Sequence, residues 1–298
     1  MFRPLCCVVL VLIMGLQGCQ THVALPPLPV WQSPEGLEHA ELGQIRELSS
    51  GRVLSPEQLV VRLARAPRVL VGEQHDNPDH HALQVWLLRA LGQYRPQGSL
   101  LLEMLQPAQQ ARVEAVRQQA QLPANVPDEL RWQKGWDWAL YGPIVEEALK
   151  QPYPLLAANL DDDEVQRIYR QPPVLSGRHS TAAAVRQVLA EQVRDSHCGL
   201  LPETQLPAML AVQQQRDRRM AERLLAAPTP SLLFAGGYHV RKDIGVPQHL
   251  ADLDVHEAPP VLMLAQVGEV IESGMADYVW YTAALPAQDY CASLRKGH

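Results

Sequence analysis

The feature that most constrains the fold is an alternation of short apolar runs with longer stretches of helical character. The apolar runs occupy residues 69–71, 100–102, 155–158, 232–235 and 261–265. Runs this short and this apolar are typical of strands buried on both faces of a parallel sheet. The stretches between them carry apolar residues at helical spacing, as in 80–91. The alternation predicts an α/β fold, with a central, mostly parallel sheet flanked by helices.

The same pattern suggests how the chain is divided. Residues 161–227 offer helices and no convincing strand, so we expect a helical subdomain inserted into the sheet order there. The rest of 41–298 follows one pattern, which predicts a single α/β domain. Hydrophobic residues make up 47% of the chain and charged residues 19%, a balance that excludes intrinsic disorder. The net charge of −6 gives a nucleic-acid partner no electrostatic support.

The N-terminus has the features of a bacterial export signal. Residues 1–18 contain the basic Arg3 and an apolar run from 5 to 16, too short for a permanent membrane span. The run ends in Leu16-Gln17-Gly18-Cys19, which resembles the lipobox of lipoproteins, in which the cysteine is lipidated with acyl chains such as palmitate. An ordinary signal peptide is the alternative. Gln20, in place of Asp, favours an outer-membrane anchor facing the periplasm, with 19–40 as the lipidated cysteine and tether.

Two cysteines remain in the exported part of the chain. Cys198 and Cys291 would lie in an oxidising compartment, where a disulfide between them can form. Their distance in space cannot be read from the sequence, so the pairing stays open at this point.

Polar side chains follow several of the predicted strands directly. The run at 69–71 leads into Glu73 and His75, the run at 100–102 into Glu103, the run at 155–158 into Asn159, and the run at 232–235 into His239. The carboxyl ends of parallel strands meet at one edge of a sheet, where ligands bind. A lone histidine at a strand end is more often a hydrogen-bonded loop residue. Two Gly-x-x-His units with carboxylates between them favour a shared site, in which the glycines allow a close approach of the backbone.

Other candidates have ordinary structural explanations. His80 and His81 are adjacent on a predicted helix and diverge by about 100°, so we expect them at the helix surface or at the edge of a pocket. The tryptophans at 132, 136 and 138 are consistent equally with core and with the wall of a site. The sequence contains no Gly-x-Ser-x-Gly elbow, Walker loop, dinucleotide fingerprint or His-Glu-x-x-His helix, which leaves elbow-type serine hydrolases and nucleotide enzymes poorly supported.

Taken together, these segments resemble the ChaN-type iron-regulated, haem-binding lipoproteins, whose superfamily also includes erythromycin esterases and the Tiki membrane proteases. The resemblance extends over most of the exported chain. One departure is Tyr238, where a smaller residue is expected before the histidine. The matching stretches are VLVGEQHDNPDHH (69–81), LLLEM (100–104), Trp138-x-x-Tyr141-x-Pro143, LLAAN (155–159), DSHCG (195–199), QQQRDRRMA (213–221), AGGYHVRKDIGVP (235–247) and DYVW (277–280).

The resemblance implies haem as cofactor, bound as a face-to-face pair in a homodimer, and service to a haem receptor or transporter. It also implies a tyrosine ligand to the iron from one subunit, with cationic side chains of the other meeting the propionates. Among the tyrosines the candidates are Tyr141, then Tyr238, then Tyr278. For the propionates they are His239 with Arg241 or Lys242.

Two alternatives remain open. The first is a hydrolase that uses the superfamily pocket, with a Glu–His pair as general base or metal site and an arginine that stabilises negative charge. Its residues would be Glu73, His75, Glu103, Asn159, Arg216, Asp217 and His239. The second is a scaffold lipoprotein that neither binds haem nor turns over a substrate.

Overall fold

A central sheet organises the molecule. The computed structural model describes residues 24–292, and in this part of the chain eight strands form one sheet in the order β2-β1-β8-β7-β3-β6-β4-β5. Strands β3 to β8 run parallel, and β1 and β2 pair antiparallel at one edge. The α/β class is therefore confirmed. The strands are β1 (Ile45–Glu47), β2 (Arg52–Leu54), β3 (Arg68–Glu73), β4 (Ser99–Leu102), β5 (Leu155–Ala157), β6 (Ser231–Gly236), β7 (Val261–Gln266) and β8 (Tyr278–Thr282).

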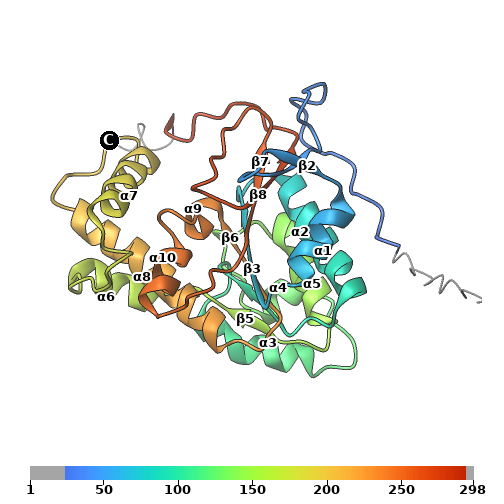
Figure 1. Cartoon of the computed structure of the whole chain (residues 1–298). Helices are drawn as coiled ribbons and strands as arrows, with labels where there is room; N and C mark the ends of the chain where they lie inside the picture. The colour runs from blue at the N-terminus through green and yellow to red at the C-terminus, as the bar shows by residue number, and fades with distance from the viewer. Residues whose placement is uncertain (1–23, 293–298) are drawn as a thin grey trace, which may run out of the picture.

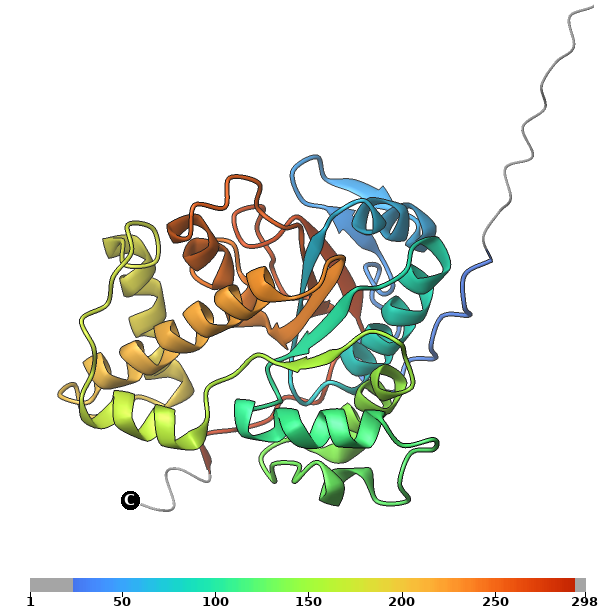
Figure 2. The same ribbon diagram turned by 90° about the horizontal axis from the view of Figure 1, so that it is seen from below.

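Helices cover both faces of this sheet. Helices α1 to α5 lie on one side and α6 to α10 on the other, with the sheet between the two layers (Figures 1 and 2). The helices are α1 (Pro56–Ala64), α2 (Pro78–Tyr94), α3 (Gln110–Arg117), α4 (Val126–Glu129), α5 (Trp138–Leu149), α6 (Asp162–Arg170), α7 (Ala183–Ser196), α8 (Leu206–Ala226), α9 (Gly237–Val240) and α10 (Val246–Asp252), and a 3₁₀ turn spans Pro107–Gln109.

The period of two along the strands explains the two layers. In β3, Val69 and Val71 pack in the core beneath α1 to α5, while Leu70 between them packs in the core beneath α8 and α10. All three are fully buried. The short apolar runs of the sequence therefore mark the strands because both faces of each strand are covered.

The segment 161–227 contains α6, α7 and α8 and, within the described residues, no strand. These helices differ in how they pack against the sheet. Met220 and Leu224 of α8 are fully buried in the same core cluster as Leu70 of β3, so α8 is part of the layer that covers the sheet. Helix α7 lies farther out and packs through a small cluster of its own.

The N-terminal segment lies against the domain from Ala24 onward. Trp86 of α2 donates its indole N–H to the carbonyl of Pro26 at 2.9 Å. The Asp79 carboxylate at the start of α2 accepts the backbone N–H groups of Gln32 (2.7 Å) and Ser33 (3.0 Å). The described part of the expected tether is therefore docked on α2. The predicted signal peptide and Cys19 lie outside the described residues, and within them no helix combines the length and apolarity of a membrane span.

The structure settles whether Cys198 and Cys291 are paired. Cys198, in the turn after α7, and Cys291, near the end of the described chain, form a disulfide with their Cα atoms 5.6 Å apart. It joins residues that are 93 positions apart in the sequence.

Candidate functional site

Three neighbouring strands bring the polar strand ends together. Strand β6 lies between β3 and β4, so Glu73 at the end of β3 is in register with Gly236 at the end of β6. Glu103, directly after β4, donates its backbone N–H to Phe234 of β6 at 3.1 Å. His75 and His239 follow β3 and β6 and line the same cavity. The expectation that separate segments build one concavity is therefore met.

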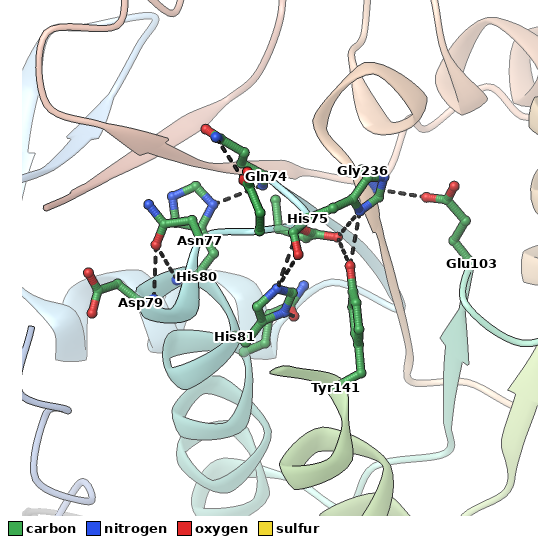
Figure 3. A network of polar contacts seen from close by, with 12 residues as sticks. Gln74, His75, Asn77, Asp79, His80, His81, Glu103, Tyr141 and Gly236 are labelled. Carbon is green, nitrogen blue, oxygen red and sulfur yellow. Dashed lines mark hydrogen bonds and ion pairs between the residues drawn. The ribbon is translucent and has the colours of Figure 1, made fainter. Parts of the chain in front are cut away.

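The first polar network joins Glu73, His75 and Tyr141 (Figure 3). The Nδ1–H of His75 donates to Glu73 Oε1 at 2.6 Å, and the Tyr141 hydroxyl donates to the same oxygen at 3.1 Å. Glu73 is completely buried at its side chain, whereas 43% of the His75 side chain is exposed. Burial lowers the pKa of His75, but the hydrogen bond to Glu73 and the charge of that carboxylate outweigh it and raise the pKa to about 9. His75 is therefore an imidazolium at neutral pH.

Tyr141, from α5, is a supporting residue of this network. It is buried with 1% exposure and does not line the cavity. Burial raises the pKa of its phenol far above the usual value, and the Glu73 charge raises it further. The hydroxyl therefore stays protonated and donates to Glu73. Its role as an iron ligand stays a prediction, and a phenolate at this position would have to form against both effects.

The second network surrounds His239. Its Nδ1 lies 2.5 Å from Asp217 Oδ1 of α8, and its Nε2 lies 3.2 Å from Glu103 Oε1. Burial lowers the pKa of His239, yet the charges of Glu103 and Asp217 raise it to about 10. Burial alone would raise the pKa of Glu103, but the positive charge of His239 holds that pKa well below its usual value. The pKa of Asp217 is raised, because burial outweighs the charge of His239 there. Both ring nitrogens of this imidazolium are used inside the protein.

Glycine at position 236 allows the two networks to approach each other. A Cβ atom there would lie 2.8 Å from both Cε1 and Nε2 of His75, closer than van der Waals contact permits. The Gly236 N–H also donates to Glu103 Oε2 at 2.8 Å. The glycine before the second histidine therefore serves the close approach that the sequence suggested.

The cavity above these networks has a volume of about 670 Å³. Its polar lining includes His75, His239 and Arg241, together with Glu73, Gln74 and Glu269. Gln192 and Ser196 of α7 close one side. The apolar part of the lining is formed by Met263, Leu264, Val270, Ile271 and Met275. A cavity of this size with a few convergent polar groups is typical of a small-molecule site.

Of the remaining tyrosine and cation candidates, Tyr238 and Arg241 line the cavity, whereas Lys242 and Tyr278 do not. Tyr238 stands at the rim with 49% exposure, and the Arg241 guanidinium lies 5.7 Å from its ring centroid. Arg241 lines the cavity and pairs with Asp243 at 2.6 Å. Lys242 pairs with Asp277 at 2.6 Å and does not line the cavity. Tyr278 is the first residue of β8, so it lies at the amino ends of the parallel strands, away from the cavity, and lines a smaller pocket.

Two further candidates lie outside the cavity wall. Asn159 is buried and donates its side-chain amide to the backbone carbonyl of Glu103 at 2.9 Å, which positions the chain rather than a ligand. Arg216 of α8 is half-buried and forms no hydrogen bond or ion pair with the described part of the chain. Neither lines the cavity.

The expectation for His80 and His81 was wrong as regards the helix surface. Burial lowers the pKa of His80 to about 3, so its neutral ring accepts the Gln74 N–H at 2.9 Å and contacts Thr282 at 3.0 Å. His81 lies beneath the site, with Nε2 3.0 Å from the His75 carbonyl oxygen. Both are buried because the start of α2 is covered by the N-terminal segment and by the sheet.

Sequence reasoning missed the apolar wall and the contribution of α7. Residues 269–275 lie in a connection with no regular periodicity, and no motif marks Gln192 or Ser196. The tryptophan cluster packs partly against the core, and Trp136 meets the His75 ring edge-on at 4.9 Å. Within the described residues no group of three or more His, Cys, Asp or Glu side chains has the arrangement of a metal site.

The fold and the paired histidines and carboxylates define an α/β protein with a ligand site at the carboxyl ends of its parallel strands. Sequence comparison identifies the family to which it belongs. A family model described as haem-binding uptake, Tiki superfamily, ChaN matches residues 59–250. The chain belongs to this family. Its members are haem-binding proteins. A search of curated proteins found no match.

One solved structure agrees with this assignment, and two others share only weaker likeness to the fold. The structure described as cofacial heme binding to ChaN of Campylobacter jejuni superimposes with a TM-score of 0.72 at 30% identity, covering 79% of this chain and 95% of that chain. An erythromycin esterase, EreC, in its open conformation gives a TM-score of 0.47 at 13% identity, covering 85% of each chain. The toxin effector domain RRSP from Vibrio vulnificus gives 0.46 at 13% identity, covering 80% of this chain and 39% of that chain.

Proposed function

We propose that this protein binds haem at the 670 Å³ cavity and serves haem uptake. One observation carries the proposal: an apolar wall, a half-exposed imidazolium and an exposed phenol meet around a single cavity. These residues fit haem, because a porphyrin has apolar faces, two carboxylates and an iron that accepts an axial ligand. When bound, haem supplies the iron centre, and this chain supplies the surroundings.

Tyr238 is the best-placed tyrosine for the iron. It is exposed at the rim and lies on the one-turn helix α9 directly after β6, with Arg241 beside its ring. A phenolate is a hard anionic ligand that suits ferric iron. Tyr141 is buried under His75, and Tyr278 lies at the amino end of β8, away from the cavity. We therefore assign the ligand role to Tyr238.

His75 and Arg241 are the cations that can meet the propionates. The Nδ1 of His75 is held by Glu73, and its Nε2 has no hydrogen-bond partner among residues 24–292, so it can meet a ligand. Arg241 shares its charge with Asp243 at the cavity wall. His239 acts indirectly, because Glu103 and Asp217 use both of its nitrogens. Hydrogen bonds from the His75 and Arg241 cations to the propionates would be charge-assisted, and such bonds are stronger than neutral ones.

A second copy of the chain would cover the mouth of the cavity. Large apolar side chains are exposed around it: Leu200, Tyr238, Val270 and Tyr290. Two of them line the cavity, and the other two adjoin the disulfide. Exposed apolar groups that gather around a binding site mark an interaction surface. A homodimer that places two haems between these rims is consistent with this distribution.

The lipobox supports anchoring of this protein at the outer membrane through Cys19, on the periplasmic side. A haem receptor or transporter would then deliver or receive the ligand there. Mass spectrometry of the membrane fraction tests the anchor, since a diacylated Cys19 has a defined mass. Cys19→Ser is the control and should lack the acyl chains. A wild-type protein that also lacks them would contradict the anchor.

Haem titration of the mature chain, residues 19–298, tests the main proposal. We expect a saturable Soret shift with ferric haem at micromolar concentration and loss of the phenolate charge-transfer band in Tyr238→Phe. Tyr278→Phe is the matched control and should leave the spectrum unchanged. Absence of a Soret shift in the wild type would refute haem binding, and an unchanged spectrum in Tyr238→Phe would refute the ligand assignment.

Hydrolysis is a second candidate function. The observation that favours it is the Glu73–His75 pair at 2.6 Å, whose imidazole reaches the cavity. Such a pair can transfer a proton to or from a reacting group. Turnover of a chromogenic ester or a peptide, abolished by His75→Gln while haem binding persists, would establish it. A chain with neither haem binding nor turnover would be the scaffold alternative.

A further inference from the structure

The C-terminal segment crosses from the sheet to the helical layer. After β8, residues 283–291 leave the sheet and end at the turn after α7 (Figure 1). The segment contacts the loop that carries His75, and its disulfide joins it to the turn after helix α7.

On the sheet side, the segment is attached to the loop that carries His75. The backbone N–H of Leu285 donates to Gln266 Oε1 at 2.7 Å, and the side-chain amide of Gln266 donates to Gln74. Farther along, the Tyr290 hydroxyl donates to Asp76 Oδ2 at 2.5 Å. The residues on both sides of His75 in the sequence are therefore tied to this segment.

On the helical side, the disulfide attaches the segment to α7. Cys291 is bonded to Cys198, two residues beyond the end of α7. Gln192 and Ser196, in the last turns of this helix, line the cavity. The disulfide therefore joins the α7 wall of the cavity to the rim at Asp76.

Helix α7 has little else to hold that end in place. Its core cluster consists of Val185, Leu189 and Ile244, and in its last turns Val193 is the one buried apolar side chain and lies outside that cluster. The other contacts at its end are local: the His197 N–H donates to Val193, and Arg194 pairs with Glu203 of the next turn. Segments with few buried apolar contacts open at low free-energy cost.

We propose that residues 283–291 and the Cys198–Cys291 disulfide form a clamp that holds the end of α7 as the closing wall of the cavity, and that a thiol reductant releases it. The step is ordinary exchange: a dithiol attacks one sulfur, the S–S bond breaks, and the reductant leaves as its own disulfide. Two electrons and two protons pass to the protein as the Cys198 and Cys291 thiols. The α7 wall then moves apart from the rim.

Hydrogen exchange on the mature chain tests the clamp without haem. After dithiothreitol, with both free thiols confirmed by alkylation and mass, amides of 189–196 should exchange at least about tenfold faster, while amides of α2 keep their protection. The Cys198→Ser, Cys291→Ser double variant should reproduce this without reductant. Unchanged exchange at 189–196 would overturn the clamp, and so would a parallel rise in α2, which would mean global loosening.

A variant that leaves the disulfide intact separates the two attachments. Tyr290→Phe removes the hydroxyl that contacts Asp76, and it should raise exchange at 189–196 by a smaller factor than reduction does. Tyr169→Phe in α6 is the matched control and should change nothing. If the protein also binds haem, reduction should accelerate haem dissociation. Failure of haem binding would refute the proposed function and leave the exchange result unaffected.

Discussion

The two Gly-x-x-His units follow neighbouring strands of the same sheet, yet their histidines differ in what they offer a ligand. His75 is held by one buried carboxylate and exposes 43% of its side chain, so one ring nitrogen is available. His239 lies between Glu103 and Asp217 with 10% of its side chain exposed, and both nitrogens are used. The same sequence motif thus produces one ligand-facing cation and one internal cation. The difference comes from α8, which brings Asp217 to His239 and has no counterpart at His75.

The largest expected effect concerns the internal cation. Glu103→Ala removes one carboxylate from the buried His239 imidazolium, and breaking such a pair costs about 3–5 kcal/mol. Denaturant unfolding should show this loss in the free energy of unfolding. Glu257→Ala, at an exposed surface carboxylate, is the control and should stay within about 0.5 kcal/mol of wild type. Equal effects of the two substitutions would mean that the buried network contributes no more to stability than a surface carboxylate does.

Gly236→Ala should create a steric clash between the new methyl group and the His75 ring. Its Cβ would lie 2.8 Å from the His75 ring, so the ring must move, at a cost of about 1–3 kcal/mol. Gly92→Ala in α2 is the matched control, because its Cβ meets no atom within 4 Å. That substitution should stabilise the protein by about 0.4–1 kcal/mol. Thermal unfolding of both variants measures the contrast, and a neutral Gly236→Ala would show that His75 is not confined.

Tyr141→Phe sharpens the description of the exposed histidine. It removes one hydrogen bond to Glu73 while keeping the ring, and should cost about 0.5–1.5 kcal/mol. The His75 spectrum should shift in NMR, because its Nδ1 lies 3.0 Å from the lost hydroxyl. If Tyr141 were instead the iron ligand, the variant would lose the charge-transfer band of haem, which is the opposite of the result expected here.

The smallest effect on stability concerns pH. The pKa of His75 is raised from 6.5 to about 9, so its stabilising contribution is complete below pH 6.5 and is lost as the pH rises through about 9. The contribution is modest because solvent screens a half-exposed pair. NMR titration should give a midpoint near 9 for His75, and Glu73→Gln should move it downward. A midpoint near 6.5 in the wild type would mean that Glu73 does not hold this proton.

The sequence was sufficient to predict the sheet and the strand-end residues, because burial on both faces leaves an apolar run and the chain turns polar where the strand ends. Glu73, His75, Glu103 and His239 were found in this way. The short edge strands β1 and β2, of three residues each, are too brief for a periodic signal. Tyr141 and Asp217 reach the site from helices far along the chain, so only the family resemblance pointed to them. The part of the apolar wall at 270–275 depends on the path of a connection, which tertiary packing decides.

The docking of residues 24–34 has a practical consequence for handling this protein. Trp86, Asp79 and Asn77 all use partners that come from this segment, and Ser33 within it is almost completely buried. A recombinant form trimmed at the first helix would leave the Asp79 carboxylate and the Trp86 indole facing solvent with their partners deleted. Expression vectors should therefore start at or before Ala24, and shorter versions should precipitate more readily on storage.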